Sequence, residues 1–163
     1  ISSAQFITLQ EEMTLVESYA KIQKIRFNGK FDFRYEIAPE TEEILVPKLI
    51  VQPIVENAVI HGMAEKIRIR VDAGKHWVRF SVSDDGAGIP QEKLEHLCGD
   101  YMELADTSSG DKKHNMGIGL IVCRDIIKVH GGNFEGRNQL EGGTEFWFTL
   151  PLKEERQYGG HKG

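Results

Sequence analysis

Two alternating segments separated by only two residues constrain the fold of this chain most strongly. In KIRIRVDA (66–73) and HWVRFSVSD (76–84) apolar and polar residues alternate, which predicts β-strands with one buried face each. Such a short turn joins antiparallel neighbours in a hairpin, because parallel neighbours need a long crossover. FDFRYEI (31–37) predicts another strand, and NFEGRNQ (133–139) with TEFWFTLPL (144–152) predicts a second antiparallel pair.

Three long segments predict helices. Residues 7–26 have the apolar period of a helix, and Thr8 with Glu11 has the spacing of a capping box. The apolar face of this helix is expected to comprise Leu9, Met13, Val16, Ala20, Ile22 and Ile25. The second helix is expected to open at Pro47 and run to about Gly62. The third is expected over 117–131, ending at Gly131 and Gly132, and a short helix is expected at 91–97.

Strands and helices do not alternate regularly along the chain, which excludes a doubly wound fold. We expect an α+β two-layer sandwich, in which three helices cover one face of a mixed, largely antiparallel sheet. Residues 1–28 are expected to form a linker helix, 29–153 the main domain and 154–163 a frayed tail.

Length, charge and cysteine content exclude several classes of protein and partner. The 163 residues fit one domain, and the net charge of −5 argues against a nucleic-acid partner. The sequence contains no signal peptide and no apolar run long enough to span a bilayer. Cys98 and Cys123 form no disulfide framework, which favours a reducing compartment. The chain begins ISSAQF without a methionine, so we expect a domain of a longer protein whose membrane segments lie upstream.

Several ligand motifs are absent, and three features remain. The sequence has no P-loop, no complete G-x-G-x-x-G, no EF-hand spacing and no Cys/His cluster with zinc spacing. What remains is an asparagine on a helix, D-x-G-x-G after a strand, and G-x-G opening a helix. The side chain of Asn57 can offer an oxygen to Mg²⁺, although Asn57 and Glu56 also suit a solvated helix surface.

The acidic turn SDDGAGIP can recognise a flat ring that carries an amine. Asp84 ends a strand and can accept a hydrogen bond from an exocyclic amine, while Gly86 and Gly88 allow close approach of the backbone. The alternative is an ordinary turn, in which Asp and Gly are common. Gly117 and Gly119 are predicted to open a helix whose free N–H groups suit phosphate, and close packing on the sheet is the alternative. Residues 99–115 are polar and unpatterned, as in a functional or disordered loop.

Taken together and in this order, the features resemble the ATP-binding domain of sensor histidine kinases, in the superfamily that includes gyrase and a heat-shock chaperone. VENAVIHG resembles the N-box, SDDGAGIP the first glycine box, NMGIGL the second and EGGTEFWFTLP the last glycine motif. The segment LQEEMTLVESYAKIQKIRF, followed by VPKLIVQPIVENA, is similar to the LytS-like subfamily. The resemblance covers nearly the whole chain.

The resemblance implies a role for each motif. Asn57 would ligate Mg²⁺ and Asp84 would bind the adenine amine of ATP. Gly86, Gly88 and Ile89 would border the ring. The remaining predicted ATP-binding residues are His61, Gly117, Gly119, Leu120 and Thr144, and the segment 99–115 would form a mobile lid.

This chain departs from the family pattern at three positions. Ile60 stands where a lysine is frequent, and Asn115 where the second glycine box often begins. Pro53 occupies the place of the carboxylate that activates water in several relatives, so rapid ATP hydrolysis is not expected. The catalytic residue stays unknown, with Glu56 as a weak candidate.

The expected function is that of the ATP-binding half of a protein-histidine kinase in a two-component system. The γ-phosphoryl group would pass to a histidine on a separate dimerisation helix of the homodimer and then to a response regulator. The domain would be cytoplasmic, with the full protein anchored in the bacterial membrane. Two alternatives on the same fold are an anti-sigma-factor-type serine kinase and a non-catalytic nucleotide sensor.

Overall fold

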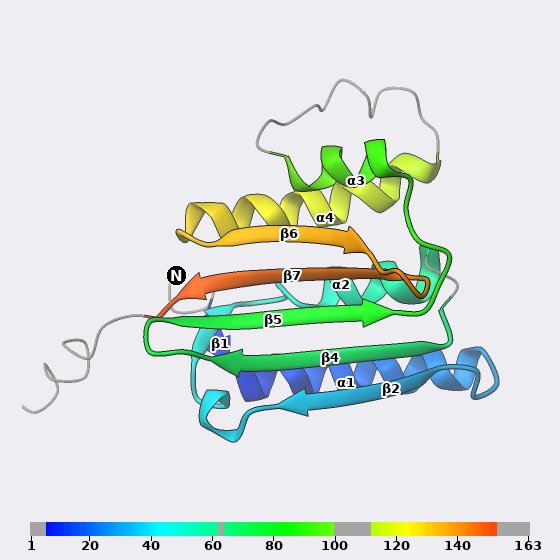
Figure 1. Ribbon diagram of the computed structural model, residues 1–163. Helices are drawn as coiled ribbons and strands as arrows, with labels where there is room; N and C mark the ends of the chain where they lie inside the picture. Colours follow the sequence, from blue (N-terminus) through cyan, green and yellow to red (C-terminus); the bar gives the residue numbers. More distant parts are fainter. Residues whose placement is uncertain (1–5, 62–63, 100–111, 153–163) are drawn as a thin grey trace, which may run out of the picture.

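A five-stranded sheet forms one layer of the protein (Figure 1). The computed structural model describes residues 6–61, 64–99 and 112–152. The strand order is β2-β4-β5-β7-β6, with β2 and β4 parallel and every other pair antiparallel. The strands are β2 (Asp32–Ile37), β4 (Lys66–Ala73), β5 (Trp77–Asp84), β6 (Asn133–Asn138) and β7 (Thr144–Pro151). The sheet is therefore mixed and largely antiparallel, as predicted.

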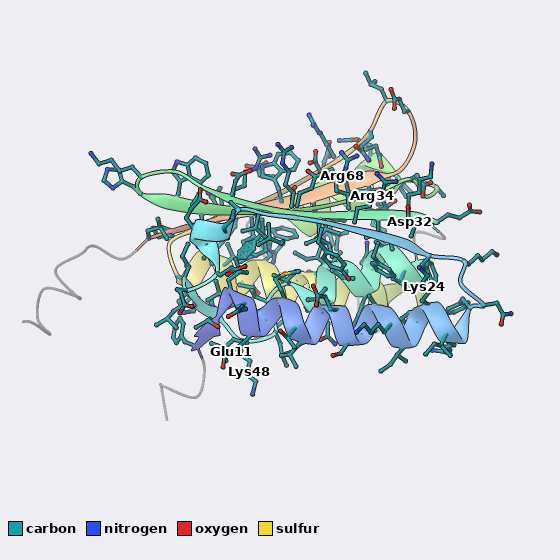
Figure 2. The ribbon with its side chains drawn as sticks, turned by 90° about the horizontal axis from the view of Figure 1, so that it is seen from below. Glu11, Lys24, Asp32, Arg34, Lys48 and Arg68 are labelled. Atoms are coloured by element: carbon teal, nitrogen blue, oxygen red, sulfur yellow. The ribbon has the colours of Figure 1, made fainter. Side chains whose placement is uncertain are left out.

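The helices lie on one face of this sheet and leave the other face open (Figure 2). They are α1 (Leu9–Arg26), α2 (Gln52–Glu56) with its π-helical continuation η3 (Asn57–His61), α3 (Gln91–Cys98) and α4 (Lys112–Val129). Arg34 and Arg68 are labelled on the open face and point away from the helices. The two-layer sandwich is thus confirmed, with α3 added beside α4 and β6.

Alternation along the strands decides which side chains enter the core. In β4, Ile67, Ile69 and Val71 are buried, while Lys66 and Arg68 are exposed. The sheet contributes stacked phenylalanines to the core: Phe80 and Phe148 have ring centroids 4.6 Å apart, and Phe134 and Phe146 5.7 Å. The predicted strands therefore agree with the structure to within about one residue at each end.

Helix α1 begins as predicted, but its buried face differs from the prediction. The N–H of Glu11 donates to Thr8 Oγ1 at 3.1 Å, and the N–H of Thr8 donates to Glu11 Oε1 at 2.9 Å. Ile22 and Ile25 are 60% and 79% exposed, whereas Glu12 is fully buried. The apolar period therefore predicted the wrong buried face for the last two turns of the helix.

The predicted helix start at Pro47 is wrong. Pro47 ends a short strand, β3 (Leu45–Pro47), which pairs antiparallel with β1 (Phe6–Thr8). The 3₁₀ turn η2 (Pro39–Thr41) precedes it. Leu49 then has a left-handed φ of 60°, a backbone conformation that a right-handed helix cannot contain. Helix α2 therefore begins later, at Gln52, with a proline in its first turn.

Helix α4 starts earlier than expected, at Lys112, and ends at Val129. The structure therefore places 112–115, the end of the predicted lid, in a helix, and 100–111 lie outside the described residues. Gly131 has a φ of 83° and follows the helix, as the predicted glycine stop requires. Residues 1–5 of the predicted linker and 153–163, which include the predicted tail, are also outside the described residues.

Candidate nucleotide site

Asp84 ends β5 with its side chain buried, at 7% exposure. Its Oδ1 accepts hydrogen bonds from the N–H of Gly86 at 2.9 Å and the N–H of Thr144 at 3.3 Å. Oδ2 has no hydrogen-bond partner in the described part of the chain and stays available to a ligand. Burial raises the pKa of Asp84 above 3.8, although the two hydrogen bonds oppose this shift.

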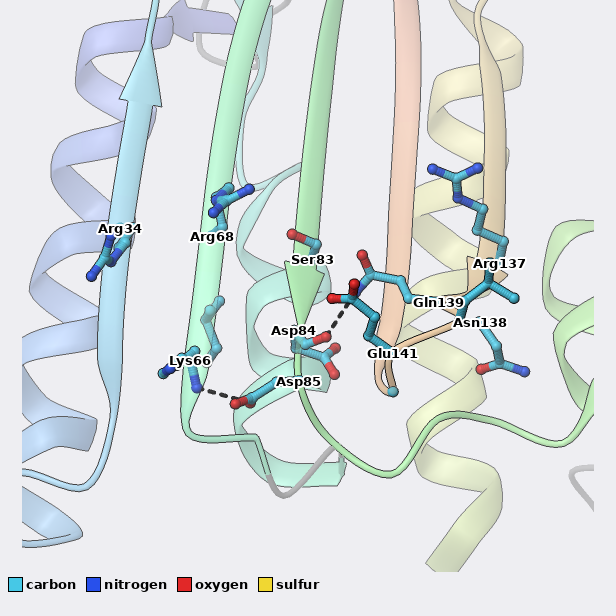
Figure 3. Close-up of a pocket in the computed structure, with 13 residues that line it drawn as sticks. Arg34, Lys66, Arg68, Ser83, Asp84, Asp85, Arg137, Asn138, Gln139 and Glu141 are labelled. Carbon is cyan, nitrogen blue, oxygen red and sulfur yellow. Dashed lines mark hydrogen bonds between the residues drawn. The ribbon is translucent and has the colours of Figure 1, made fainter.

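Asp85 points elsewhere and closes the turn (Figure 3). Its Oδ1 accepts the N–H groups of Glu65 and Lys66, each at 2.9 Å. Partial burial acts to raise its pKa, but these hydrogen bonds outweigh burial, and the net shift is downward. The two adjacent carboxylates therefore differ in role, because Asp85 fixes the turn while Asp84 keeps an oxygen free.

The turn between β6 and β7 is pressed against Asp84. Gly143 has a φ of 88°, and a Cβ built on it would lie 1.9 Å from the backbone oxygen of Asp84. Gly88 has a φ of 85°, and a Cβ there would lie 3.1 Å from Asn138 Oδ1. Only glycine fits this approach of backbone to backbone at Gly143.

Asn138 is a site residue that the sequence analysis missed. Its Oδ1 accepts the N–H of Ile89 at 2.8 Å, and its Nδ2 donates to the carbonyl of Ile89 at 2.6 Å. Gln139 Nε2 donates to the carbonyl of Asp84 at 2.9 Å. No local sequence pattern indicates this role, because Asn138 ends one strand and contacts a turn 49 residues away in the sequence.

Thr144 contacts both Asp84 and Asn138. Its N–H donates to Asp84, and its hydroxyl lies 3.4 Å from Asn138 Oδ1, while the residue itself is buried. A cavity of about 480 Å³ adjoins this region and is lined by Gly88, Ile89 and the residues of the β6–β7 turn. The predicted border of Gly86, Gly88 and Ile89 is therefore brought together with Thr144.

A larger cavity of about 640 Å³ lies over the open face of the sheet (Figure 3). Arg34, Arg68 and Arg137 line it, and each forms an ion pair with a carboxylate of the open face. Of the predicted site residues, Asp84 alone lines this cavity. We therefore place the candidate site at the glycine-rich turn rather than in the larger hollow.

Asn57 is the first residue of η3 and is 6% exposed. Its Oδ1 is buried without a hydrogen-bond partner among the described residues. A buried carbonyl oxygen of this kind fits a hard cation, which prefers oxygen ligands. Glu56 is half-buried and accepts a hydrogen bond from Gln52 Nε2 at 3.1 Å. The side chain of His61 lies outside the described residues.

The prediction that Gly117 and Gly119 open a helix is wrong. Because α4 begins at Lys112, Gly117 and Gly119 lie within the helix, beyond its first four N–H groups, and do not open it. Gly119 has open space around it, since a Cβ there would meet nothing within 4 Å. Leu120 is 1% exposed and packs in the core. The surroundings of Gly117 lie outside the described part of the structure.

Comparison with known proteins identifies this arrangement. The profile described as "Histidine kinase-, DNA gyrase B-, and HSP90-like ATPase" matches residues 43–154. The sensor protein LytS of Bacillus cereus is 30% identical over 161 residues, which are 93% of this chain and 26% of LytS. This chain therefore spans about a quarter of the length of that relative.

Solved structures give the same result. The catalytic domain of histidine kinase ThkA has a TM-score of 0.68 and 28% identity, covering 90% of this chain and 94% of that domain. ThkA in complex with the response regulator protein TrrA has a TM-score of 0.65 and 25% identity, covering 91% of this chain and 41% of ThkA. Among the described helices, none is both long and apolar enough to cross a membrane.

Proposed function

Because this chain belongs to the histidine kinase-, DNA gyrase B- and HSP90-like ATPase family, we propose that its glycine-rich turn binds the adenine of ATP. The chain is the ATP-binding catalytic domain of a histidine kinase. Asp84 accepts the adenine amine on Oδ2, since Oδ1 is held by two backbone N–H groups. Gly86, Gly88, Ile89 and Thr144 form the border of the ring. The available Oδ2 of a buried carboxylate carries this proposal.

Asn57 is the proposed Mg²⁺ ligand, and its unpartnered buried oxygen supports this role. When bound, Mg²⁺ neutralises charge on the phosphates and orients them for phosphoryl transfer. Gly117 and Gly119 are proposed to let the phosphates approach the backbone of α4, with His61 in the same phosphate-binding region. Leu120 is proposed to contribute its backbone alone, because its side chain lies in the core. Glu56 remains the candidate for a catalytic residue.

In the full protein, we propose that the γ-phosphoryl group passes to a histidine on a separate dimerisation helix and then to a response regulator. The structure of ThkA with a response regulator supports this kind of partner. Residues 1–28 would link that dimerisation helix to the ATP-binding domain, residues 29–153, and residues 154–163 would form a tail. The domain would face the cytoplasm, with membrane anchoring through the remainder of the protein.

Titration calorimetry with Mg²⁺-ATP and Mg²⁺-GTP tests the adenine role. We expect a preference for ATP, because guanine presents a carbonyl where Asp84 needs a donor. Asp84→Asn should weaken ATP binding by about tenfold or more, since its amide can meet the adenine amine with its own donor. Asp85→Asn is the matched control, with the same chemical change in the adjacent residue, and should retain the preference for ATP. Equal affinity for ATP and GTP in the unmodified protein would overturn the proposal.

A further inference from the structure

A buried carboxylate joins the first helix to the segment that precedes the nucleotide-site asparagine. Glu12 of α1 is fully buried. Its Oε1 accepts the N–H of Leu49 at 2.9 Å and its Oε2 accepts the N–H of Val51 at 3.0 Å. Both carboxylate oxygens therefore hold backbone 37 and 39 residues away in the sequence.

The segment that Glu12 holds is strained and lies at the entrance of a helix. Leu49 has a φ of 60°, a left-handed conformation that costs a non-glycine residue of the order of 1 kcal/mol or more. Val51 is the N-cap of α2, and no side chain of its own provides a capping hydrogen bond. Glu12 accepts the N–H of Val51 itself, which is one of the backbone donors that a helix start leaves without a partner in the helix.

The same segment is fixed on its other side by α4. Cys123 Sγ donates to the carbonyl of Ile50 at 3.1 Å, and Ile50 and Val51 are fully buried. From Val51 the chain continues through α2 directly into η3, where Asn57 is the first residue. A displacement at Leu49–Val51 therefore reaches Asn57 through one turn and a half of continuous helix.

The charge of Glu12 is compensated by the backbone segment that it holds. In the described part of the chain no lysine or arginine forms an ion pair with Glu12. Burial of an unpaired charge is costly, and here backbone N–H groups alone compensate it. Tyr19, also on α1, has a buried hydroxyl without a hydrogen-bond partner among the described residues, and burial followed by the charge of Glu56 raises its pKa to about 12.

We infer that Glu12 is a positioning residue, which sets the place of Asn57 by holding the backbone of Leu49 and Val51. The inference rests on the proposed function for the meaning of Asn57, but the position of Asn57 can be measured without nucleotide. Since both hydrogen bonds originate on α1, a shift of α1 along the domain is transmitted to the metal end of the site.

Glu12→Gln tests this inference in the full 163-residue chain. The amide keeps the shape of the side chain but presents an NH₂ to one of the two N–H donors, so one hydrogen bond is lost. We expect the side-chain amide resonance of Asn57 to shift in the nucleotide-free protein. We also expect the Mg²⁺-dependent part of ATP affinity to fall by about tenfold, with adenosine affinity unchanged. Glu11→Gln is the matched control: it changes the neighbouring residue identically at the cap of α1, and both readouts should stay unchanged.

An unchanged Asn57 resonance in Glu12→Gln would overturn the inference, and so would an equal loss of ATP and adenosine affinity. If Glu12→Gln does not fold, Glu12→Asp replaces it: this variant keeps both acceptor oxygens and draws the segment toward α1, so the Asn57 resonance must still move. If the resonance moves while the unmodified protein shows no Mg²⁺-dependent binding, the proposed metal role fails and the positioning of Asn57 by Glu12 stands.

Discussion

At the scale of single residues, the two adjacent carboxylates of the acidic turn have opposite environments. Asp84 is buried and its pKa is raised, while Asp85 has a lowered pKa because backbone N–H groups outweigh its partial burial. The sequence DD shows neither difference, because burial and backbone donors come from segments far along the chain. A stability measurement can separate these environments.

We predict that Asp84→Asn raises the melting temperature at pH 7.5. A pKa raised in the folded state means that the folded protein binds the proton more tightly than the unfolded chain. This carboxyl therefore contributes stability below its ordinary pKa of 3.8, and the contribution is lost as the pH rises through the folded-state pKa. The asparagine oxygen can still accept both backbone bonds without a buried charge.

The gain from Asp84→Asn should shrink as the pH is lowered toward about 4, and circular dichroism at several pH values measures it. Asp85→Asn should have the opposite effect on stability. A carboxyl whose pKa is lowered in the folded state stabilises the protein at pH 7.5, and this stabilisation is lost as the pH falls. Asp85→Asn should therefore lower the melting temperature at pH 7.5. A loss of stability in both variants at pH 7.5 would contradict the assigned environment of Asp84.

At the scale of elements, the contact of the β6–β7 turn with the end of β5 holds the site together. We predict that Gly143→Ala destabilises the protein by roughly 3 kcal/mol or more, since the added Cβ adds a clash with Asp84 to the cost of a left-handed backbone. Gly29→Ala is the matched control, with a φ of 76° and nothing within 4 Å of the Cβ. It should cost only about 1–2 kcal/mol. Urea unfolding of both variants measures the difference, and equal costs would show that the turn is not pressed against Asp84.

Elements whose pattern is local were predictable, and those that depend on distant partners were not. Strand β4 alternates because it has one covered face, so its bounds followed from the sequence alone. Pro47 has the form of a helix start, yet pairing with β1 makes it part of a strand. Ile22 continues the apolar period of α1 but is 60% exposed, while the neighbouring Gln23 is buried. The role of Asn138 depends on a turn far along the chain, which no local period reveals.

At the scale of the whole molecule, we predict that the chain alone does not phosphorylate its own histidines. His130 is held by a 2.7 Å contact from Nδ1 to the carbonyl of Ile126, and its ring lies edge-on to Phe6. His76 precedes the first residue of β5, whereas Asp84 ends it, a separation of about 25 Å along the strand. In-line transfer needs the acceptor beside the γ-phosphate.

Labelled ATP should therefore give no acid-labile phosphohistidine on this chain. A separate polypeptide that carries the dimerisation helix should become labelled when it is added. His96 lies in α3, and the side chains of His61, His114 and His161 lie outside the described residues, so mass spectrometry should examine these four histidines. Stoichiometric labelling of any histidine of the isolated chain would contradict its assignment as the donor half.

The strand order has a consequence for synthesis on the ribosome. β7 is the last of the described strands to be made, yet it lies between β5 and β6 and is the sheet partner of β6. A nascent chain that has emerged only as far as β6 has no partner for that strand, and Asp84 still lacks the N–H of Thr144. The proposed nucleotide site is therefore complete only after β7 has been made, so a nascent chain that stops before β7 lacks the Thr144 contact to Asp84.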